Sequence, residues 1–461
     1  MGALTDLVNA IVWPAGTGLT DTRLARVWAG RNGRLTFDLQ LTLHGPSGAS
    51  RHSVQGVVSI SSPPNRIVKQ PIRFEHGSLL GILRTDPVRF AWLSTPDCDP
   101  ELPPARRLFR PRGLHDLLAD ARFARIAPAG QEPSRTGSPA MNLVSYRVGR
   151  RFVAAIRTDD DGARLFVKGF RRMPGPTSLH RAAELAAMLA TRSSGEIRVP
   201  LVRGALPELG LLISDEVWPA PSPVHYAAAD VALAARVAAA IHSLPCVGDE
   251  RVHRAADEWD TVDRWHDVLG VLCPHVATPL QEIRERLRDQ TPTAGRETMT
   301  LIHRDFHHAQ LLRNERAIWL VDWDTLCLGH PEQDIATYAA HAVLDAALGS
   351  VSGDDGFIRL NAFLDAHHNA GGMIDSPRLG WYLAVALARV AAMHTARGFP
   401  DGALAPVWQL ALAISDNTGL WTETTRRNHV DIAPSQPCAQ PSTGAFHRDA
   451  MALAAREPGA A

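Results

Sequence analysis

The stretch Leu301-Ile302-His303-Arg304-Asp305-Phe306-His307-His308-Ala309-Gln310-Leu311-Leu312 decides how the rest of the sequence is interpreted. A second stretch follows it closely, Ala317-Ile318-Trp319-Leu320-Val321-Asp322-Trp323-Asp324. In each stretch, apolar residues flank a carboxylate, a pattern typical of an acidic side chain presented by a buried scaffold. Asp305 and Asp322 are therefore the first candidates for chemistry.

Two carboxylates on neighbouring segments suit phosphoryl transfer. That reaction needs one carboxylate to orient the attacking hydroxyl and another to hold Mg²⁺ together with a second oxygen ligand. It also needs a lysine that pairs with the phosphates of ATP and is steadied by a glutamate. Mg²⁺ prefers hard oxygen ligands, so an aspartate and an amide oxygen are suitable. The sequence supplies each of these residue types in the required order.

Several segments resemble those of the aminoglycoside phosphotransferases in order and spacing. His303-Arg304-Asp305, with Gln310 following, resembles the catalytic loop that these enzymes share with protein kinases. Val321-Asp322-Trp323-Asp324 looks like their metal-binding segment, and 329–336 matches their Gly-x-Pro-x-x-Asp-x-Ala pattern. The helix end at 241–245 is similar to that of their first C-lobe helix. The resemblance extends over residues 140 to 420, approximately.

The resemblance implies a role for each matching residue in the catalytic half of the site. Asp305 would be the catalytic base, Asp322 the principal Mg²⁺ ligand and Gln310 the second metal ligand. Asp334 would brace the catalytic loop as a structural carboxylate, and His303 would be a buried scaffold residue of that loop. The expected cofactors are ATP, or GTP, and Mg²⁺.

The resemblance also implies a nucleotide site upstream. Lys168 would pair with the phosphates and Glu184 would steady it; Lys168 and Lys69 are the only lysines in the chain. An arginine substitutes poorly for such a compact ammonium group. The other residues expected at the nucleotide are two at the phosphates and two near the adenine: Gly149, Arg150, Ile213 and Ser214.

Two positions depart from the usual family pattern. Residue 310 is a glutamine where asparagine is usual, as in the maltokinase and glucosamine kinase branch, which also has extra N-terminal domains. The turn at 146–151 contains Gly149 as its single glycine, with Arg150 and Arg151 beside it. The favoured acceptor is therefore a sugar or amino sugar, with an aminoglycoside as the second choice.

The expected fold is α+β. The resemblance implies a protein-kinase-like, two-lobed fold, with a small β-sheet N-lobe carrying one helix and a large helical C-lobe, plus an extra N-terminal α+β domain. The expected boundaries are a β-rich accessory domain, the N-lobe, the C-lobe and a disordered tail, at 1–130, 131–217, 218–430 and 431–461. Alternation of polar and apolar residues or short apolar runs predict strands at 36–43, 57–60, 72–74, 143–147, 152–157, 165–168 and 211–214. Apolar periodicity predicts helices at 178–191, 227–243, 280–288, 378–397 and 404–414, the third entered just after Pro279.

Composition limits the classes of partner. The 48 basic and 48 acidic residues leave no net charge, which argues against a nucleic acid or an anionic membrane as the partner. A small molecule bearing a hydroxyl is expected instead. The five cysteines include no CxxC pair, and there is no long apolar run, so we expect a cytoplasmic protein without a membrane span.

Alternative interpretations accompany these expectations. His303, His307 and His308 are candidates for a transition-metal cluster, although a fourth ligand at a suitable spacing is not evident. The acidic residues of 257–267 are candidates for a cation pocket, but a solvated helix face is favoured, with Trp259 and Trp265 in the core. For the whole chain, the alternatives are an antibiotic-modifying phosphotransferase and a pseudokinase that binds nucleotide without turnover.

Overall fold

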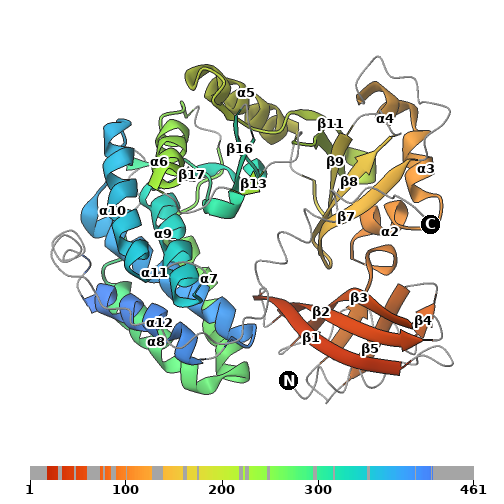
Figure 1. Ribbon diagram of the computed structural model, residues 1–461, viewed down its shortest axis with the longest axis horizontal. Helices are drawn as coiled ribbons and strands as arrows, with labels where there is room; N and C mark the ends of the chain where they lie inside the picture. Colours follow the sequence, from red (N-terminus) through yellow and green to blue (C-terminus); the bar gives the residue numbers. More distant parts are fainter. Residues whose placement is uncertain are drawn as a thin grey trace. The chain divides into compact units, whose positions relative to one another are not determined.

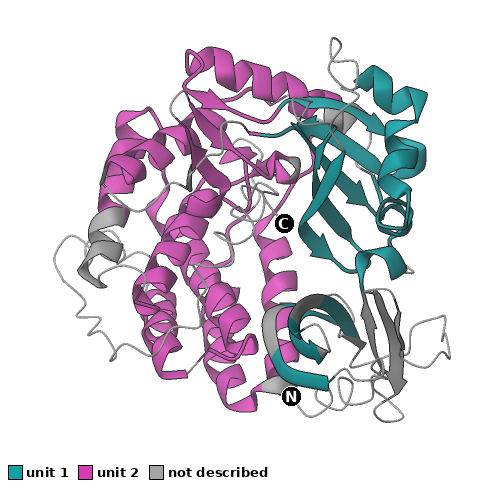
Figure 2. Cartoon of the chain, turned by 45° about the vertical axis from the view of Figure 1, so that its right-hand side comes forward, with its two compact units in different colours: residues 1–174, 201–216, 442–461 teal, residues 175–200, 217–441 magenta. Residues whose placement is uncertain are grey.

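The computed structural model divides the chain into two compact units, which Figure 2 distinguishes by colour. Unit 1 comprises residues 1–174, 201–216 and 442–461, and unit 2 comprises 175–200 and 217–441. The residues that the structure describes are 18–29, 34–45, 48–59, 73–75, 78–84, 90–99, 101–126, 139–158, 164–173, 176–217, 222–223, 228–246, 250–293, 298–314, 317–349, 353–399, 401–416 and 418.

Unit 1 begins with an antiparallel sheet, which we call the accessory sheet. Its strands run in the order β1-β2-β3-β6-β5-β4, with the bounds Gly18–Ala29 (β1), Arg34–Gly45 (β2), Gly48–Ser59 (β3), Arg73–Glu75 (β4), Ser78–Arg84 (β5) and Phe90–Ser94 (β6). Strand β2 forms because its sequence alternates, which buries Leu35, Phe37, Leu39, Leu41 and Leu43 on one face. The strand expected at 36–43 is confirmed. Strand β4 covers 73–74 of the strand expected at 72–74 and β3 covers 57–59 of the one expected at 57–60; residues 72 and 60 lie outside the described residues.

The second sheet of unit 1 is the N-lobe sheet, with strand order β11-β12-β9-β8-β7. Its strands are Ala140–Arg147 (β7), Arg151–Arg157 (β8), Arg164–Phe170 (β9), Val202–Leu206 (β11) and Leu211–Asp215 (β12), which confirms all four strands expected there. Short helices lie between the two sheets in sequence: Pro103–Leu108 (α2), Gly113–Leu118 (α3) and Ala121–Ile126 (α4), after the 3-10 turn Pro96–Cys98 (η1).

A single hydrophobic core joins these parts of unit 1. It contains Val57 of β3, Leu102 just before α2, Phe123 of α4 and Phe152 of β8. Gly169 is required opposite Phe152, because a Cβ there would lie 2.0 Å from the phenyl ring. The accessory sheet, the short helices and the N-lobe sheet therefore bury one another's apolar surface.

Unit 2 is mainly helical (Figure 1). Its helices are Pro176–Arg192 (α5), Ala228–His242 (α6), Ala255–Leu272 (α7), Pro274–Arg288 (α8), Glu332–Ala347 (α9), Gly353–Asn369 (α10), Ser376–Ala396 (α11) and Asp401–Asp416 (α12). Helix α11 is buried almost throughout and contacts α7, α8, α9 and α12, so it is the central element of this core. Short strands complete the unit in two small sheets: Ile197–Arg198 (β10), Ser222–Pro223 (β13), Thr300–Ile302 (β14), Leu311–Arg313 (β15), Ile318–Leu320 (β16) and Cys327–Gly329 (β17).

The expected α+β class is confirmed, as are the five expected helices, with one corrected start. Helix α8 begins at Pro274 rather than after Pro279, because Pro274 takes the first-turn position that needs no backbone N–H and Pro279 is tolerated inside the helix. In the described part of the chain, no helix is long and apolar enough to cross a membrane. The tail expected at 431–461 lies outside the described residues.

Candidate active site

Asp305 and Asp322 each stand a few residues after a short strand. Asp305 follows β14, and Asp322 follows β16 with Val321 between them. Strands β15 and β16 form a hairpin, and the N–H of Val321 donates to the carbonyl oxygen of Gln310 at 3.0 Å. This hydrogen bond joins the loop that carries Asp305 and Gln310, which we call the catalytic loop, to the loop that carries Asp322, the metal loop.

His303 adds a second connection between these loops. Its imidazole is fully buried, and Nε2 lies 2.8 Å from the carbonyl oxygen of Val321. The hydroxyl of Thr325 donates to the carbonyl oxygens of His303, at 2.7 Å, and of Asp322, at 2.9 Å. The expected scaffold role of His303 is confirmed.

Asp334, in the first turn of α9, binds the backbone of the catalytic loop. Its fully buried carboxylate accepts the N–H of His303 at 2.7 Å and that of Arg304 at 2.8 Å. Arg304 has a φ of 71° and Asp322 a φ of 55°, a left-handed backbone that costs non-glycine residues about 1 kcal/mol or more. Such strain persists only where surrounding contacts impose it, and Asp334 supplies them at Arg304. The expected bracing role of Asp334 is confirmed.

Gln310 lies beside Asp305. Its side-chain Nε2 is 3.4 Å from Oδ2 of Asp305 and 3.3 Å from Nε2 of His307. Burial raises the pKa of Asp305, but the charges of His307, Arg389 and His303 outweigh it, so the pKa is lowered overall. Asp305 is therefore held as a carboxylate, the form that accepts a proton from a hydroxyl.

The donor atoms of the metal loop and catalytic loop fit Mg²⁺. With Nε2 of Gln310 directed at Asp305, the amide oxygen is the atom left for a cation, and Asp322 adds a carboxylate. Among the described residues, no group of three or more His, Cys, Asp or Glu could hold a metal ion. The transition-metal interpretation of His303, His307 and His308 is therefore wrong within the described residues. Mg²⁺ commonly takes one or two protein ligands and completes its shell with phosphates and water, so one carboxylate and one amide oxygen fit it.

Imidazoles form the surface next to Asp305. The ring of His307 stacks on that of His341 in α9, with centroids 4.3 Å apart. His308 Nδ1 lies 3.6 Å from the carboxylate of Asp345, one turn further along α9. Burial and the neighbouring His307 and His308 lower the pKa of His341 well below its usual value. At neutral pH the His341 ring is therefore uncharged and offers one donor and one acceptor.

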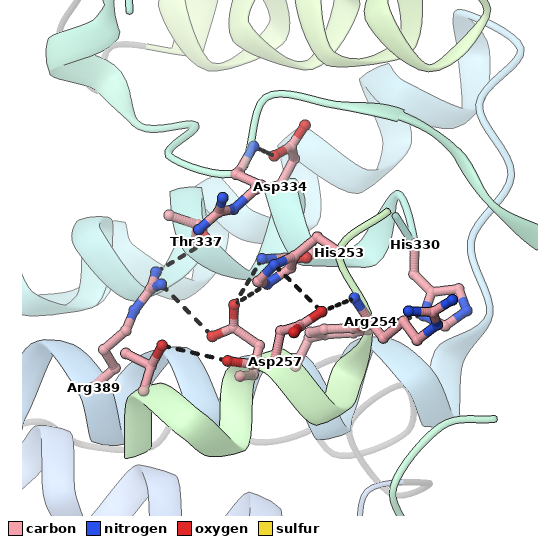
Figure 3. Close-up of polar contacts among 12 residues, drawn as sticks. His253, Arg254, Asp257, His330, Asp334, Thr337 and Arg389 are labelled. Carbon is pink, nitrogen blue, oxygen red and sulfur yellow. Dashed lines mark hydrogen bonds and ion pairs between the residues drawn. The ribbon is translucent and has the colours of Figure 1, made fainter. Parts of the chain in front are cut away.

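Buried charged and polar side chains of α7, α9 and α11 form a network of contacts (Figure 3). Glu258 of α7 is 4% exposed; its Oε1 lies 2.7 Å from His253 Nε2 and accepts from Gln333 at 2.9 Å. Arg389 of α11 lies 3.6 Å from Glu258 Oε2 and 3.4 Å from the Thr337 hydroxyl. Burial raises the pKa of Glu258, but Arg389 and His253 lower it to about 2.

The prediction that the acidic residues of 257–267 form a solvated helix face is wrong for Glu258. Asp260 and Asp267 are exposed, as predicted, but Glu258 is buried. It shares one face of α7 with Ala255, Val262 and Trp265, all buried. That helical spacing was the signal available in the sequence. The core position expected of Trp265 is confirmed.

Unit 1 carries the residues expected at the nucleotide except Glu184. Lys168 lies on β9 and is half-buried; its register partners are Val153 on β8 and Leu212 on β12. Ile213 and Ser214 follow on β12, so the fold brings these two and Lys168 onto adjacent strands. Arg150 is exposed in the turn between β7 and β8.

Gly149 has a different environment from the one expected. It is buried, and its N–H donates to Oδ2 of Asp99 at 2.6 Å. This amide is therefore bonded to protein, where a glycine of a phosphate-binding loop would offer it to a ligand. Asp99 was missed by sequence reasoning, because it follows a short 3-10 segment that has no periodicity.

Glu184 lies on α5, in unit 2. Its side chain is 48% exposed and contacts His180 at 3.2 Å and Arg181 at 3.3 Å on its own helix. The pairing of Glu184 with Lys168 stays a prediction.

Comparison with known proteins shows the family of the chain. The sequence matches the family model described as "Phosphotransferase enzyme family" over residues 143–379. The chain belongs to this family. It is an ATP-dependent small-molecule kinase with a hydroxyl acceptor. A search of curated proteins finds no significant match.

The comparison with solved structures finds the following three proteins, among others, and the likeness concerns the fold. One is a choline/ethanolamine kinase family protein from Mesorhizobium loti, at 15% identity, covering 66% of this chain and 97% of its own, with a TM-score of 0.40. Another is a choline kinase from Cryptosporidium parvum, at 8% identity, covering 66% and 96%, with a TM-score of 0.45. A third is a spectinomycin phosphotransferase in complex with ADP and spectinomycin, at 14% identity, covering 60% and 92%, with a TM-score of 0.40.

Proposed function

We propose that the protein transfers the γ-phosphoryl group of ATP to a hydroxyl of a sugar or amino sugar, with Mg²⁺ as the metal. The observation that carries the proposal is the contact of Gln310 with Asp305 at 3.4 Å, in a loop hydrogen-bonded to the Asp322 loop. This contact and the hydrogen bond between the loops support a proton acceptor, Asp305, that lies close to the two proposed metal ligands, Gln310 and Asp322.

Asp305 is the proposed base. As a carboxylate with a lowered pKa, it accepts a hydrogen bond from the acceptor hydroxyl and takes its proton as the oxygen attacks the γ-phosphorus. The bond from that phosphorus to the β,γ-bridging oxygen breaks, and ADP leaves with that oxygen. Asp322 and Gln310 would hold Mg²⁺, which neutralises charge on the phosphates. Lys168, steadied by Glu184, would bind the phosphates, with Ile213 and Ser214 near the base of the nucleotide. Asp334 and His303 keep the base in place through the contacts described above.

The surface beside Asp305 favours an uncharged acceptor. The uncharged ring of His341 and the stacked ring of His307 suit hydrogen bonds to sugar hydroxyls. The guanidinium of Arg389 is among the charges that act on Asp305 and His341, which disfavours a protonated amine there. Asp345, 3.6 Å from His308, is the nearby carboxylate that would suit an amine instead. An amino sugar or an aminoglycoside would need that contact.

Two alternatives to a sugar kinase, a pseudokinase and an antibiotic-modifying enzyme, make different predictions about turnover and acceptor. A pseudokinase would bind nucleotide without turnover, and the nonstandard Gln310 and the single glycine of 146–151 favour it. It has, however, no chemical need for Asp305, Asp322, Lys168 and Glu184 together. An antibiotic-modifying enzyme would prefer a polycationic acceptor.

The test is Mg²⁺-dependent ATP consumption with neutral sugars, amino sugars, amino alcohols and aminoglycosides. Asp305→Asn should lower kcat with the best acceptor by about 10²- to 10⁴-fold. Asp260→Asn, which changes an exposed aspartate on α7, is the matched control and should leave kcat unchanged. ATP binding with no turnover for any acceptor, unaltered by Asp305→Asn, would favour the pseudokinase.

A further inference from the structure

The accessory sheet reaches the turn between β7 and β8 through two side chains. Gln55 of β3 is 3% exposed; its Oε1 accepts the N–H of Val148 at 2.8 Å, and its Nε2 donates to the carbonyl oxygen of Tyr146. Asp99, which follows β6 and η1, is fully buried. Its Oδ2 accepts the N–H of Gly149 at 2.6 Å and the hydroxyl of Tyr146 at 2.8 Å.

These contacts use the backbone amides that a phosphate-binding turn would offer. Val148 and Gly149 are both buried. Releasing the two N–H groups would leave Oε1 of Gln55 without its donor and remove one of the donors to the buried Asp99 carboxylate. An unsatisfied buried polar group costs about 1–3 kcal/mol. The connection is therefore a permanent joint rather than a switch.

Only glycine fits at position 149. Its φ is 63°, and a Cβ there would lie 2.3 Å from Oε2 of Glu101. Glu101 is itself held by Arg34 of β2 and by Arg171, whose NH1 is 3.7 Å away. Gly149 is therefore explained by the joint with the accessory region, without a phosphate.

Arg150 is the exposed residue of the turn. The turn is tight, because the N–H of Arg150 donates to the carbonyl oxygen of Arg147 at 3.0 Å. The carbonyl oxygen of Arg150 accepts the N–H of Arg171 at 2.9 Å, which fixes its backbone to the end of β9. Its guanidinium offers planar donors suited to phosphate oxygens.

We propose that Gln55 and Asp99 are positioning residues of the nucleotide site, which fix this turn so that the Arg150 guanidinium binds the nucleotide phosphates in place of backbone amides. The inference rests on the proposed function, because it takes this turn as part of the phosphate side of the site. It gives the accessory sheet a role in nucleotide affinity and explains a turn with one buried glycine among several arginines.

The test compares dissociation constants for ATP and for adenosine, measured by calorimetry on the full-length protein. Arg150→Ala should weaken ATP binding about tenfold, the loss of one charge-assisted contact, and leave adenosine binding unchanged. Gln55→Ala should weaken ATP binding about threefold to tenfold and also spare adenosine. The double variant should bind ATP as Arg150→Ala does, because Gln55 acts through Arg150. Asp116→Asn, at an exposed ion pair of α3, is the control and should change neither constant.

A second pair of variants guards against loss of folding. Asp99→Asn keeps an oxygen that can accept from Gly149, so it should lose less ATP affinity than Asp99→Ala at a similar Tm. The inference is overturned if Arg150→Ala binds ATP as the wild type does, or if Gln55→Ala weakens ATP and adenosine equally. A wild-type protein that binds no ATP would instead refute the proposed function itself.

Discussion

The indole N–H of Trp323, in the metal loop, donates to the carbonyl oxygen of Ala182 on α5 at 3.0 Å. Glu184 lies half a turn further along the same helix. The hydrogen bond therefore connects the segment after Asp322 with the helix that presents the proposed partner of Lys168. Both segments belong to unit 2, so this coupling is a property of one compact unit.

Trp323→Phe should weaken ATP use while leaving the fold intact. Phenylalanine keeps most of the buried ring but loses the hydrogen bond, which contributes about 1 kcal/mol, or roughly fivefold in kcat/KM for ATP. Trp259→Phe is the matched control, because the Trp259 indole donates to the Thr291 hydroxyl at 2.9 Å, outside both site loops. Steady-state kinetics on both variants checks the prediction. An equal effect of the two substitutions would show that the Trp323 contact has no special connection with the site.

Asp334→Ala should destabilise the protein and remove activity together. The substitution leaves the N–H groups of His303 and Arg304 without their acceptor, at a cost of about 3 kcal/mol in the free energy of unfolding. It also releases the left-handed backbone at Arg304. Asp334→Asn keeps one oxygen and should lose about half as much stability. Urea unfolding and kcat are the measurements, and full activity in Asp334→Ala would contradict the bracing role.

Removing Arg389 should cost more stability than removing the charge of Glu258. Arg389→Met leaves the buried carboxylate with its hydrogen-bond partners His253 and Gln333 but without the Arg389 charge, and breaking a buried pair in this way costs about 3–5 kcal/mol. Glu258→Gln leaves an arginine whose side chain is 21% exposed and can turn toward water. The double variant should recover part of the loss. A double-mutant cycle from urea unfolding measures the coupling, and strictly additive losses would refute it.

Gln310→Ala should raise the Mg²⁺ concentration needed for half-maximal activity about tenfold or more, since lost metal-site groups typically cost that much. Gln310→Glu keeps an oxygen ligand and should stay close to wild type in Mg²⁺ requirement. Titration of activity with Mg²⁺ at saturating ATP distinguishes them. An unchanged Mg²⁺ requirement in Gln310→Ala would remove Gln310 from the metal site and leave it as a partner of Asp305.

The sequence allowed the catalytic loop, the metal loop and Asp334 to be predicted because their spacing is local and their residue types are dictated by chemistry. The strands of the N-lobe sheet were predictable for the same reason, since alternation and turns act over a few residues. The joint at Gly149 was not predictable. Gln55 and Asp99 are separated by 93 and 50 residues from the amides they accept, and neither belongs to a recognisable motif.

The Glu258 network could be predicted only in part: the burial of Glu258 had a signal in the sequence, and its pairing with Arg389 had none. Its helical spacing with Ala255 and Val262 placed it on the buried face, but the neighbouring aspartates masked that pattern. Its partner Arg389 lies on α11, more than a hundred residues away, so the pairing depends on how α7, α9 and α11 pack. Long-range polar pairs of this kind follow from the tertiary fold and leave no local signature.

Buried histidines should make the protein sensitive to acid. His330 is fully buried and contacts the Tyr382 hydroxyl at 2.8 Å. Burial and Arg378, opposed by Asp375, lower its pKa to about 4, below the ~6.5 of an unfolded histidine. Below pH ~6.5 the unfolded state gains a proton that the folded state does not, so stability is full above that pH and is lost as the pH falls toward 4.

The contribution of His330 to this loss can be isolated. Between pH ~7.5 and ~5 it amounts to about 2 kcal/mol in the free energy of unfolding. His330→Gln, which keeps a group able to bond Tyr382, should reduce the pH dependence by that amount. His180→Gln, at a side chain that is 80% exposed, is the control and should leave it unchanged. Urea unfolding at the two pH values provides the comparison. Equal pH dependence in His330→Gln and the wild type would mean that His330 takes up a proton in the folded protein, against the direction that its burial beside Arg378 imposes.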